Sequence, residues 1–334
     1  MIASKNETEY KRVLAGLSRK YKMTDEGLLE YYVGIEVEQK PGEIILRQRG
    51  YAKKVLERFG MEECNAVETP MVGKYNKKMG PQTEEERSEM RQVDYRGAIG
   101  AIRYLADTTR PELDNAVTTM SRFCNDPGRE HWSGVKRIMR YIKGSLNYGL
   151  RYTKDGDNNG LTMYGYSDAD YGGCEDTRKS VSGCIAMLAG GPVAWASRKQ
   201  QCVTLSTMES EYVALTAAAT ELIWLRNLLG ELKVPQLNPT VLYGDNVAAN
   251  LQTKRPGVSR SAKHIDTKYH FIRECVSMEK LDVKHVRSSE NLADVFTKAL
   301  PTFTFKKLTS KFMFDDTGEL KRRGDVFYAV YLTR

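Results

Sequence analysis

The sequence lacks the features that mark membrane, secreted and zinc- or disulfide-stabilised proteins. No apolar run approaches the roughly 18 residues that a membrane-spanning helix needs. The first residues, MIASKNETEYKR, contain no apolar stretch of the kind found in secretion signals. The six cysteines include no Cys-x-x-Cys pair, which leaves no indication of a zinc site or a disulfide framework. We therefore expect an intracellular protein, cytoplasmic or nuclear, with no membrane partner.

Positive charge is in excess. Lysine and arginine number 51 against 43 aspartates and glutamates, giving a formal net charge of +8. This balance favours a polyanionic partner such as nucleic acid, although on its own it is weak evidence. The length of 334 residues predicts two or three domains.

The first 72 residues predict a small mixture of helices and strands. An apolar stripe predicts a helix over 5–20, and two β-rich runs around Lys40-Pro41-Gly42 predict a hairpin. A short helix is expected over 50–59. Residues 73–92 are polar and contain glycine and proline, so we expect a linker or a long surface loop.

Residues 94–150 have helical periodicity throughout and are expected to form three helices. In the third of these, Lys136, Arg140 and Lys143 are spaced i, i+4, i+7 opposite the apolar face. Such a stripe is either a solvated helix face or a track for nucleic-acid phosphates, and the local sequence does not separate the two.

From residue 161 the apolar period changes to two. The pattern predicts three strands, a long helix over 206–232, a strand ending at Asp245, further helices, a strand ending near His285 and a last helix from Asn291. This order is typical of a mixed α/β layer.

Carboxylates stand where strands of this layer end. Asp168 ends the first strand and Asp245 the fourth, and ligands gather beyond the carboxyl ends of strands in open α/β sheets. Asp294 falls in the first turn of the last predicted helix. Each position also has a purely structural explanation, because aspartate is common at strand ends and in first helical turns.

Two glutamates near the start of the long helix compete for a fourth place. Ser206 and Glu209 have the spacing of a capping box, which gives Glu209 a structural role. Glu211 lies on the apolar stripe that faces the sheet, about 200° around the helix from Glu209. We therefore favour Glu211. Four carboxylates without cysteine or histidine predict an oxygen-only site for two Mg²⁺ ions, with Mn²⁺ as the alternative.

At these positions the sequence resembles a known family. Asp168 in YSDAD, Glu211 in SEYVAL, Asp245 in YGDN and Asp294 in ENLAD resemble the Asp-Glu-Asp-Asp set of ribonuclease H. The flanking segments WASRKQQCVTLSTMESEYVAL and NLADVFTKALP resemble the Pol polyproteins of copia-type retrotransposons, and the resemblance extends over nearly the whole chain. It implies that these four residues are both the catalytic residues and the metal ligands.

The resemblance also implies a fold and a division into domains. We expect a ribonuclease H-like mixed sheet flanked by helices, preceded by a helical thumb or connection region and a small α+β remnant of a reverse transcriptase palm. The expected segments are the palm remnant at 1–72, a linker at 73–93, the helical region at 94–155, the ribonuclease H domain at 156–301 and a tail at 302–334. The Tyr-x-Asp-Asp strand of the family's polymerase site is missing from the sequence, so we expect no polymerase activity.

Further residues are candidates for the same site. In many ribonuclease H enzymes a histidine near the position of His285 assists proton transfer. Arg198 and Lys199 precede the long helix and are either nucleic-acid contacts or solvated loop charges. Asp170 shares a strand face with Asp168, and whether it or Glu209 contributes stays open.

The implied activity is metal-dependent, endonucleolytic hydrolysis of the RNA strand of an RNA–DNA hybrid. The implied partners are that hybrid and the remainder of a retroelement polyprotein, whereas the sequence does not indicate an oligomeric state. Two rival interpretations are a module that binds nucleic acid without cutting it and an inactive or repurposed retroelement fragment.

Overall fold

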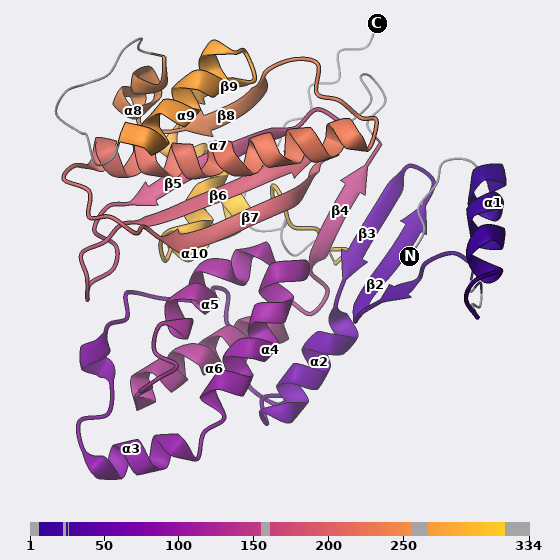
Figure 1. Cartoon of the computed structure of the whole chain (residues 1–334). Helices are drawn as coiled ribbons and strands as arrows, with labels where there is room; N and C mark the ends of the chain where they lie inside the picture. Colours follow the sequence, from indigo (N-terminus) through magenta and orange to yellow (C-terminus); the bar gives the residue numbers. More distant parts are fainter. Residues whose placement is uncertain (1–6, 23–24, 26, 155–160, 255–265, 318–334) are drawn as a thin grey trace, which may run out of the picture.

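Two β-sheets carry the fold, and in Figure 1 strands β2–β4 lie to the right while β5–β9 lie at the upper left. The computed structural model describes residues 7–22, 25, 27–154, 161–254 and 266–317. Within them, the first sheet has the strand order β1-β2-β3-β4 and the second has the order β7-β6-β5-β8-β9. No helix among these residues is long and apolar enough to cross a membrane.

The first sheet and its neighbours confirm the predicted helix, hairpin and short helix. The elements are α1 (Glu7–Ser18), β1 (Tyr31–Tyr32), β2 (Ile35–Lys40), β3 (Glu43–Arg47) and α2 (Arg49–Arg58). The fourth strand, β4 (Gly149–Thr153), pairs with β3 and begins in a segment that we expected to be helical. A Cβ at Gly149 would lie 2.4 Å from the Leu46 carbonyl oxygen, so this pairing needs glycine there.

The segment 73–92 contains helices, so the prediction of a linker or loop is wrong in part. A 3₁₀ helix, η1 (Lys77–Met79), precedes α3 (Glu84–Arg91). The Thr83 side chain caps α3 by accepting a hydrogen bond from the Glu86 N–H, and three glutamates occupy its first turn. Only Met90 of α3 is buried, so α3 has no apolar stripe from which a helix could be predicted.

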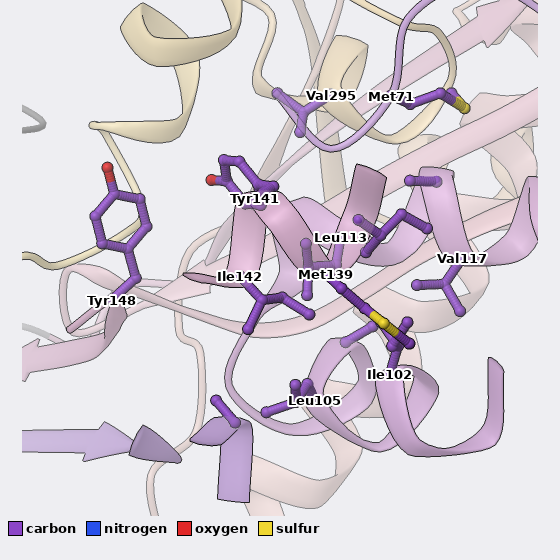
Figure 2. Close-up of a cluster of buried hydrophobic side chains, with 14 of the residues drawn as sticks. Met71, Ile102, Leu105, Leu113, Val117, Met139, Tyr141, Ile142, Tyr148 and Val295 are labelled. Carbon is purple, nitrogen blue, oxygen red and sulfur yellow. The ribbon is translucent and has the colours of Figure 1, made fainter. Parts of the chain in front are cut away.

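The expected helical region forms a shared hydrophobic core. Its elements are α4 (Tyr95–Thr108), η2 (Pro111–Leu113), α5 (Asp114–Ser121) and α6 (Arg129–Gly144). Figure 2 shows Ile102, Leu113 and Met139 from these helices in one cluster with Val295, which follows the second sheet in the chain. Beside this core, Arg110 Nε donates to Glu112 Oε1 at 2.6 Å, so two fully buried charges neutralise each other.

The second sheet confirms the predicted mixed α/β layer. Its strands are β5 (Tyr164–Asp170), β6 (Val181–Leu188), β7 (Gly191–Lys199), β8 (Thr240–Gly244) and β9 (Leu281–His285). Strand β5 is antiparallel to β6 and parallel to β8. The helices are α7 (Thr207–Glu231), α8 (Val247–Thr253) and α9 (Asp266–Ser277), and α7 crosses one face of the sheet (Figure 1).

The chain after β9 differs from the prediction in two ways. The helix expected from Asn291 is replaced by a short 3₁₀ helix, η4 (Leu292–Phe296), which follows another, η3 (Ser288–Glu290), and α10 (Thr302–Thr309) follows Pro301. Residues 302–317, the described part of the predicted tail, also pack against the protein, because Phe305 and Phe312 are buried in the main core. The rest of the predicted tail, 318–334, lies outside the described residues.

The helices α4–α6 also cover the edge of the second sheet. Strand β7 has a sheet neighbour on one side only, which leaves backbone N–H groups in need of partners. Asp114 Oδ2 accepts a hydrogen bond from the Ser197 N–H at 2.7 Å, and the Trp195 indole N–H donates to the Ala106 carbonyl at 2.9 Å. The predicted domain boundary at 155/156 therefore crosses shared packing, and the division into domains stays a prediction.

We expect Asp114→Ala to lower the free energy of unfolding by about 3 kcal/mol. The substitution removes a buried carboxylate that pairs with Arg103 at 2.6 Å and accepts a hydrogen bond from the Ser197 N–H of β7. Asp107→Ala is the matched control. Asp107 contacts the same Arg103 at 3.5 Å, but its side chain is 56% exposed, so the loss should stay within about 0.5 kcal/mol. Urea denaturation measures both, and equal losses would contradict the role given to Asp114.

Candidate active site

Three aspartates meet at one end of the second sheet. Asp168, Asp245 and Asp294 each offer a carboxylate oxygen, and these three atoms lie within 4.8 Å of one another. Tyr166 and Tyr243 are register partners on the parallel strands β5 and β8. Asp168 lies two residues after Tyr166, and Asp245 lies two residues after Tyr243. The two aspartates therefore lie side by side at adjacent strand ends.

Two buried polar side chains hold Asp294 beside this pair. Asn291 is fully buried, and its Nδ2 donates to the Ser167 carbonyl at 3.0 Å while its Oδ1 accepts from the Ala293 N–H at 3.2 Å. The Thr297 hydroxyl donates to Asp168 Oδ2. Asn291 and Thr297 thus tie the two ends of η4 to β5. The sequence analysis missed both as site residues, although each lies within three positions of Asp294.

The start of α7 separates the two glutamates as the sequence predicts. The Ser206 hydroxyl accepts from the Glu209 N–H at 3.2 Å, and Glu209 Oε2 accepts from the Leu205 N–H at 2.7 Å. The Glu209 carboxylate therefore serves the helix start, although its partner is Leu205 rather than the Ser206 N–H of a regular capping box.

Glu211 is only 6% exposed and interacts electrostatically with the aspartates. Burial, followed by the charges of Asp168 and Asp245, raises the pKa of Glu211 to about 9. Glu211 stands outside the set of oxygens within 4.8 Å of one another. The structure thus brings three of the four predicted ligands together and places the fourth within electrostatic reach.

A lysine that the sequence analysis missed enters the same cluster. Lys298 Nζ lies 3.1 Å from Asp294 Oδ1 and 3.5 Å from Asp168 Oδ2. Burial lowers the pKa of Lys298, but the two carboxylates raise it by more. The pKa of Lys298 therefore lies above that of an exposed lysine, and the amine is charged. Its spacing of i+4 from Asp294 was the available signal.

The pKa of Asp294 is also raised, although Lys298 lies close to it. Burial, followed by the charge of Asp168, raises the pKa of Asp294 to about 7 even though Lys298 acts against the shift. Its Oδ1 atom is buried and accepts no hydrogen bond of regular geometry among the described residues, so its close contact with Lys298 is ionic. A buried carboxylate oxygen whose near partner is a cation fits a cation-binding site.

The donor set of the cluster suits a metal ion. Asp168 and Asp294 are buried, Asp245 is half-buried, and all three offer hard oxygen ligands with no cysteine or histidine in the set. Such carboxylate-only sites favour Mg²⁺, Mn²⁺ or Ca²⁺ over zinc. The three aspartates could therefore hold a divalent cation.

Two other candidates lie at the same end of the sheet. His285 is exposed at the end of β9 and is the register partner of Gly244, so it stands beside Asp245. Asp170 is half-buried and outside the cluster of three, with its Oδ2 atom 3.7 Å from Lys74 Nζ. Burial raises the pKa of Asp170, and Lys74 opposes the shift.

The predicted basic stripe on α6 has partners within the protein. Arg140 Nε donates to the Asn65 carbonyl at 2.7 Å, and the Lys143 amine donates to the Glu62 carbonyl. These contacts favour a structural role for two of the three residues, while Lys136 is half-buried and its phosphate contact stays a prediction.

The two basic residues at the end of β7 differ in their surroundings. Arg198 is 73% exposed and lies 3.4 Å from Glu221 of α7. Lys199 is also exposed. The predicted nucleic-acid contacts of both residues are untested by this geometry.

Sequence comparisons connect most of the chain to a retroelement polyprotein and part of it to other proteins. A family model described as reverse transcriptase (RNA-dependent DNA polymerase) matches residues 1–73. Over 92% of its length the chain is 38% identical to the retrovirus-related Pol polyprotein from transposon TNT 1-94 of Nicotiana tabacum, and it spans 23% of that polyprotein. It is 30% identical over 67% of its length to an uncharacterized mitochondrial protein of Arabidopsis thaliana, of which it covers 90%.

Solved structures align with parts of the chain at low similarity. The N-terminal ribonuclease H domain of a Mycobacterium tuberculosis protein, solved as a fusion with maltose-binding protein, aligns over 45% of this chain and 97% of that one, at 11% identity and a TM-score of 0.31. The foamy viral protease–reverse transcriptase in complex with an RNA/DNA hybrid aligns over 90% of this chain and 37% of that one, at 12% identity and a TM-score of 0.37. The strand order of the sheet, rather than these alignments, defines the fold.

We expect the metal-free protein to lose stability as the pH rises from about 4 to about 9. The pKa values of Asp294 (about 7) and Glu211 (about 9) exceed those of exposed carboxyl groups, so in this window the folded state binds more protons than the unfolded state. The free energy of unfolding must then fall as the pH rises. Urea denaturation in EDTA at several pH values measures the slope, and Glu211→Gln should flatten its upper part. An identical pH dependence in the variant would refute the assignment.

Lys298→Gln should weaken the metal-free fold and strengthen metal binding. Removing the ammonium group leaves Asp168 and Asp294 uncompensated, and we expect a loss of about 2 kcal/mol, since the 36% exposure of Lys298 places it below a fully buried pair. Calorimetry with Mn²⁺ should show several-fold tighter binding because no internal cation competes. Lys254→Gln, which breaks an exposed pair with Asp282, is the control and should change neither quantity. Unchanged or weaker Mn²⁺ binding by Lys298→Gln would exclude competition.

Proposed function

The chain belongs to the Pol polyproteins of copia-type retrotransposons, and from this premise we propose that it carries a metal-dependent ribonuclease H active on RNA–DNA hybrids. The proposed reaction is endonucleolytic hydrolysis of the RNA strand. It is assigned to residues 156–301, with 94–155 as the helical connection region and 1–72 as the palm remnant. The chain spans less than a quarter of the Pol polyprotein with which it aligns over 92% of its length, so the remainder of such a polyprotein is proposed as a partner.

The convergence of the carboxylates carries this proposal. Asp168, Asp245 and Asp294 come from β5, from the end of β8 and from η4, and their oxygens lie within 4.8 Å of one another. A structural explanation for each aspartate alone does not account for their meeting, because like charges repel. Their order along the chain, with Glu211 second, is that of the ribonuclease H set.

Asp168, Glu211, Asp245 and Asp294 would hold two Mg²⁺ ions. A pair of ions held by these residues would supply activation of a water molecule and stabilisation of the leaving oxygen in phosphodiester hydrolysis. The chain's own residues do the positioning: Asn291 and Thr297 fix η4 against β5 and thereby orient Asp294 and Asp168. His285 is assigned to proton transfer because it is exposed and lies beside Asp245.

The hybrid would be bound chiefly by its shape and its backbone. An A-like duplex exposes 2′-hydroxyl groups across a wide minor groove, so little base specificity is expected. Lys136, Arg198 and Lys199 are the proposed phosphate contacts, whereas Arg140 and Lys143 would act only after leaving their present carbonyl partners.

A cleavage assay tests the proposal. The full chain is incubated with a labelled RNA–DNA hybrid in Mg²⁺ or in EDTA, and single-stranded RNA and a DNA duplex serve as substrate controls. Cleavage of only the RNA strand, and only with Mg²⁺, is the expected result. Salt-sensitive binding without cleavage would instead support a non-catalytic binding module. The absence of both binding and cleavage would support an inactive fragment.

The two glutamates of α7 provide a matched pair of variants. Glu211→Gln keeps the shape of the side chain but removes the carboxylate that would hold a metal ion next to Asp168 and Asp245, so the cleavage rate should fall by roughly 100-fold or more. Glu209→Gln keeps an acceptor for the Leu205 N–H and should cleave at nearly the normal rate. Single-turnover rates on one hybrid measure both. A slow Glu209→Gln beside a normal Glu211→Gln would reverse the assignment.

A further inference from the structure

A lysine-bearing segment from the first half of the chain lies against the loop that follows β5. We define the strap as residues 74–80. Lys74 Nζ lies 3.7 Å from Asp170 Oδ2, Asn76 Nδ2 donates to Glu175 Oε2 at 2.7 Å, and the Lys77 N–H donates to Asp176 Oδ1 at 2.9 Å. The strap thus contacts residues about 100 positions later in the sequence, at the proposed catalytic end of the second sheet.

The start of α6 holds the strap from its other side. His131 is buried, and its Nδ1 accepts from the Gly128 N–H at 3.0 Å. Its Nε2 therefore carries the proton and donates to the Asn76 carbonyl at 3.0 Å. A Cβ on Gly128 would lie 2.0 Å from the Met79 carbonyl oxygen, so glycine is required for this approach. The strap is a positioned element, not a free linker.

The lysine side chains of the strap are exposed to solvent. Lys74, Lys77 and Lys78 are all exposed. The acidic loop residues Glu175 and Asp176 accept hydrogen bonds from the Asn76 amide and the Lys77 backbone rather than from lysine amines. Within the described residues, no ion pair is formed by the ammonium groups of Lys77 or Lys78, so both are available to an external anion.

The strap is adjacent to the carboxylate cluster. Its contact Asp170 stands two residues after Asp168 on the same strand and the same face. Across the sheet, Asp170 is the register partner of Val181, which in turn is the partner of Lys199. Directly opposed strand residues share a face, so exposed Lys199 lies on the same face and at the same end as Asp168.

We propose that the strap and Lys199 form a phosphate-binding surface that holds the nucleic-acid duplex over the carboxylate cluster. This inference rests on the proposed ribonuclease H function and names a substrate surface for it. A duplex is the polyanion that fits, because its regularly spaced phosphates reach several separated lysines at once, and such contacts fix position without reading sequence. Residues far outside 156–301 then belong to the substrate-binding surface.

The test measures hybrid binding by the full chain in EDTA, where no cleavage occurs, over a range of salt concentrations. Lys77→Gln/Lys78→Gln should weaken binding about 10-fold or more at 0.1 M salt and reduce the slope of log K against log salt by about 2. Lys74 is left unchanged because it contacts Asp170. The matched control is Lys53→Gln/Lys54→Gln on α2, which removes the same charge from two other exposed lysines and should change the slope little.

Each outcome separates this inference from the function on which it rests. An unchanged slope in Lys77→Gln/Lys78→Gln, or an equal change in both double variants, overturns the strap while cleavage by the unmodified chain in Mg²⁺ still supports the ribonuclease. An unmodified chain that neither binds nor cleaves the hybrid overturns the proposed function itself. Thermal melting of both variants, expected to match the unmodified chain, excludes loss of the fold as the cause.

Discussion

Four carboxyl groups are held close together at one end of a sheet, and the repulsion between them is the constraint on which the site depends. Asp168 is 1% exposed, so water does little to screen its neighbours. Three features of the metal-free protein offset this repulsion. The Thr297 hydroxyl donates a hydrogen bond to Asp168, and the Lys298 ammonium lies between Asp168 and Asp294. The raised pKa values of Glu211 and Asp294 favour their neutral forms. A divalent cation would replace all three, which couples metal binding to the stability of the fold.

The rest of the molecule holds that end of the sheet in place. Leu292, Val295 and Phe296 of η4 belong to the same hydrophobic core as the helices α4–α6, so Asp294 is positioned partly by residues far earlier in the chain. Asp114 and Trp195 fasten the edge strand β7 to the same helices. The second sheet and the helical region are therefore one packing unit around the site, even where the sequence indicates separate segments.

The sequence predicted the features that depend on local periodicity. The strands of the second sheet, the long helix α7 and the burial of Glu211 rather than Glu209 all follow from which residues share a face. Strand β4 was missed because its partner β3 lies about 100 residues earlier, and α3 was missed because it buries only Met90. The roles of Asn291 and Thr297 depend on contacts with β5 in three dimensions, which no local pattern encodes, whereas the i+4 spacing of Lys298 from Asp294 indicates only its pairing with Asp294. The stripe on α6 has helical spacing as expected, but Arg140 and Lys143 bind carbonyls that only the tertiary fold brings near.

Anomalous diffraction from crystals grown with Mn²⁺ tests the central claim most directly, because it locates the cation without reference to activity. The account predicts anomalous peaks within coordination distance of Asp168, Asp245 and Asp294, with Glu211 turned toward the same site and the Lys298 ammonium displaced from between Asp168 and Asp294. A protein saturated with Mn²⁺ that has no peak at these residues, or whose Lys298 still bridges Asp168 and Asp294, would contradict it.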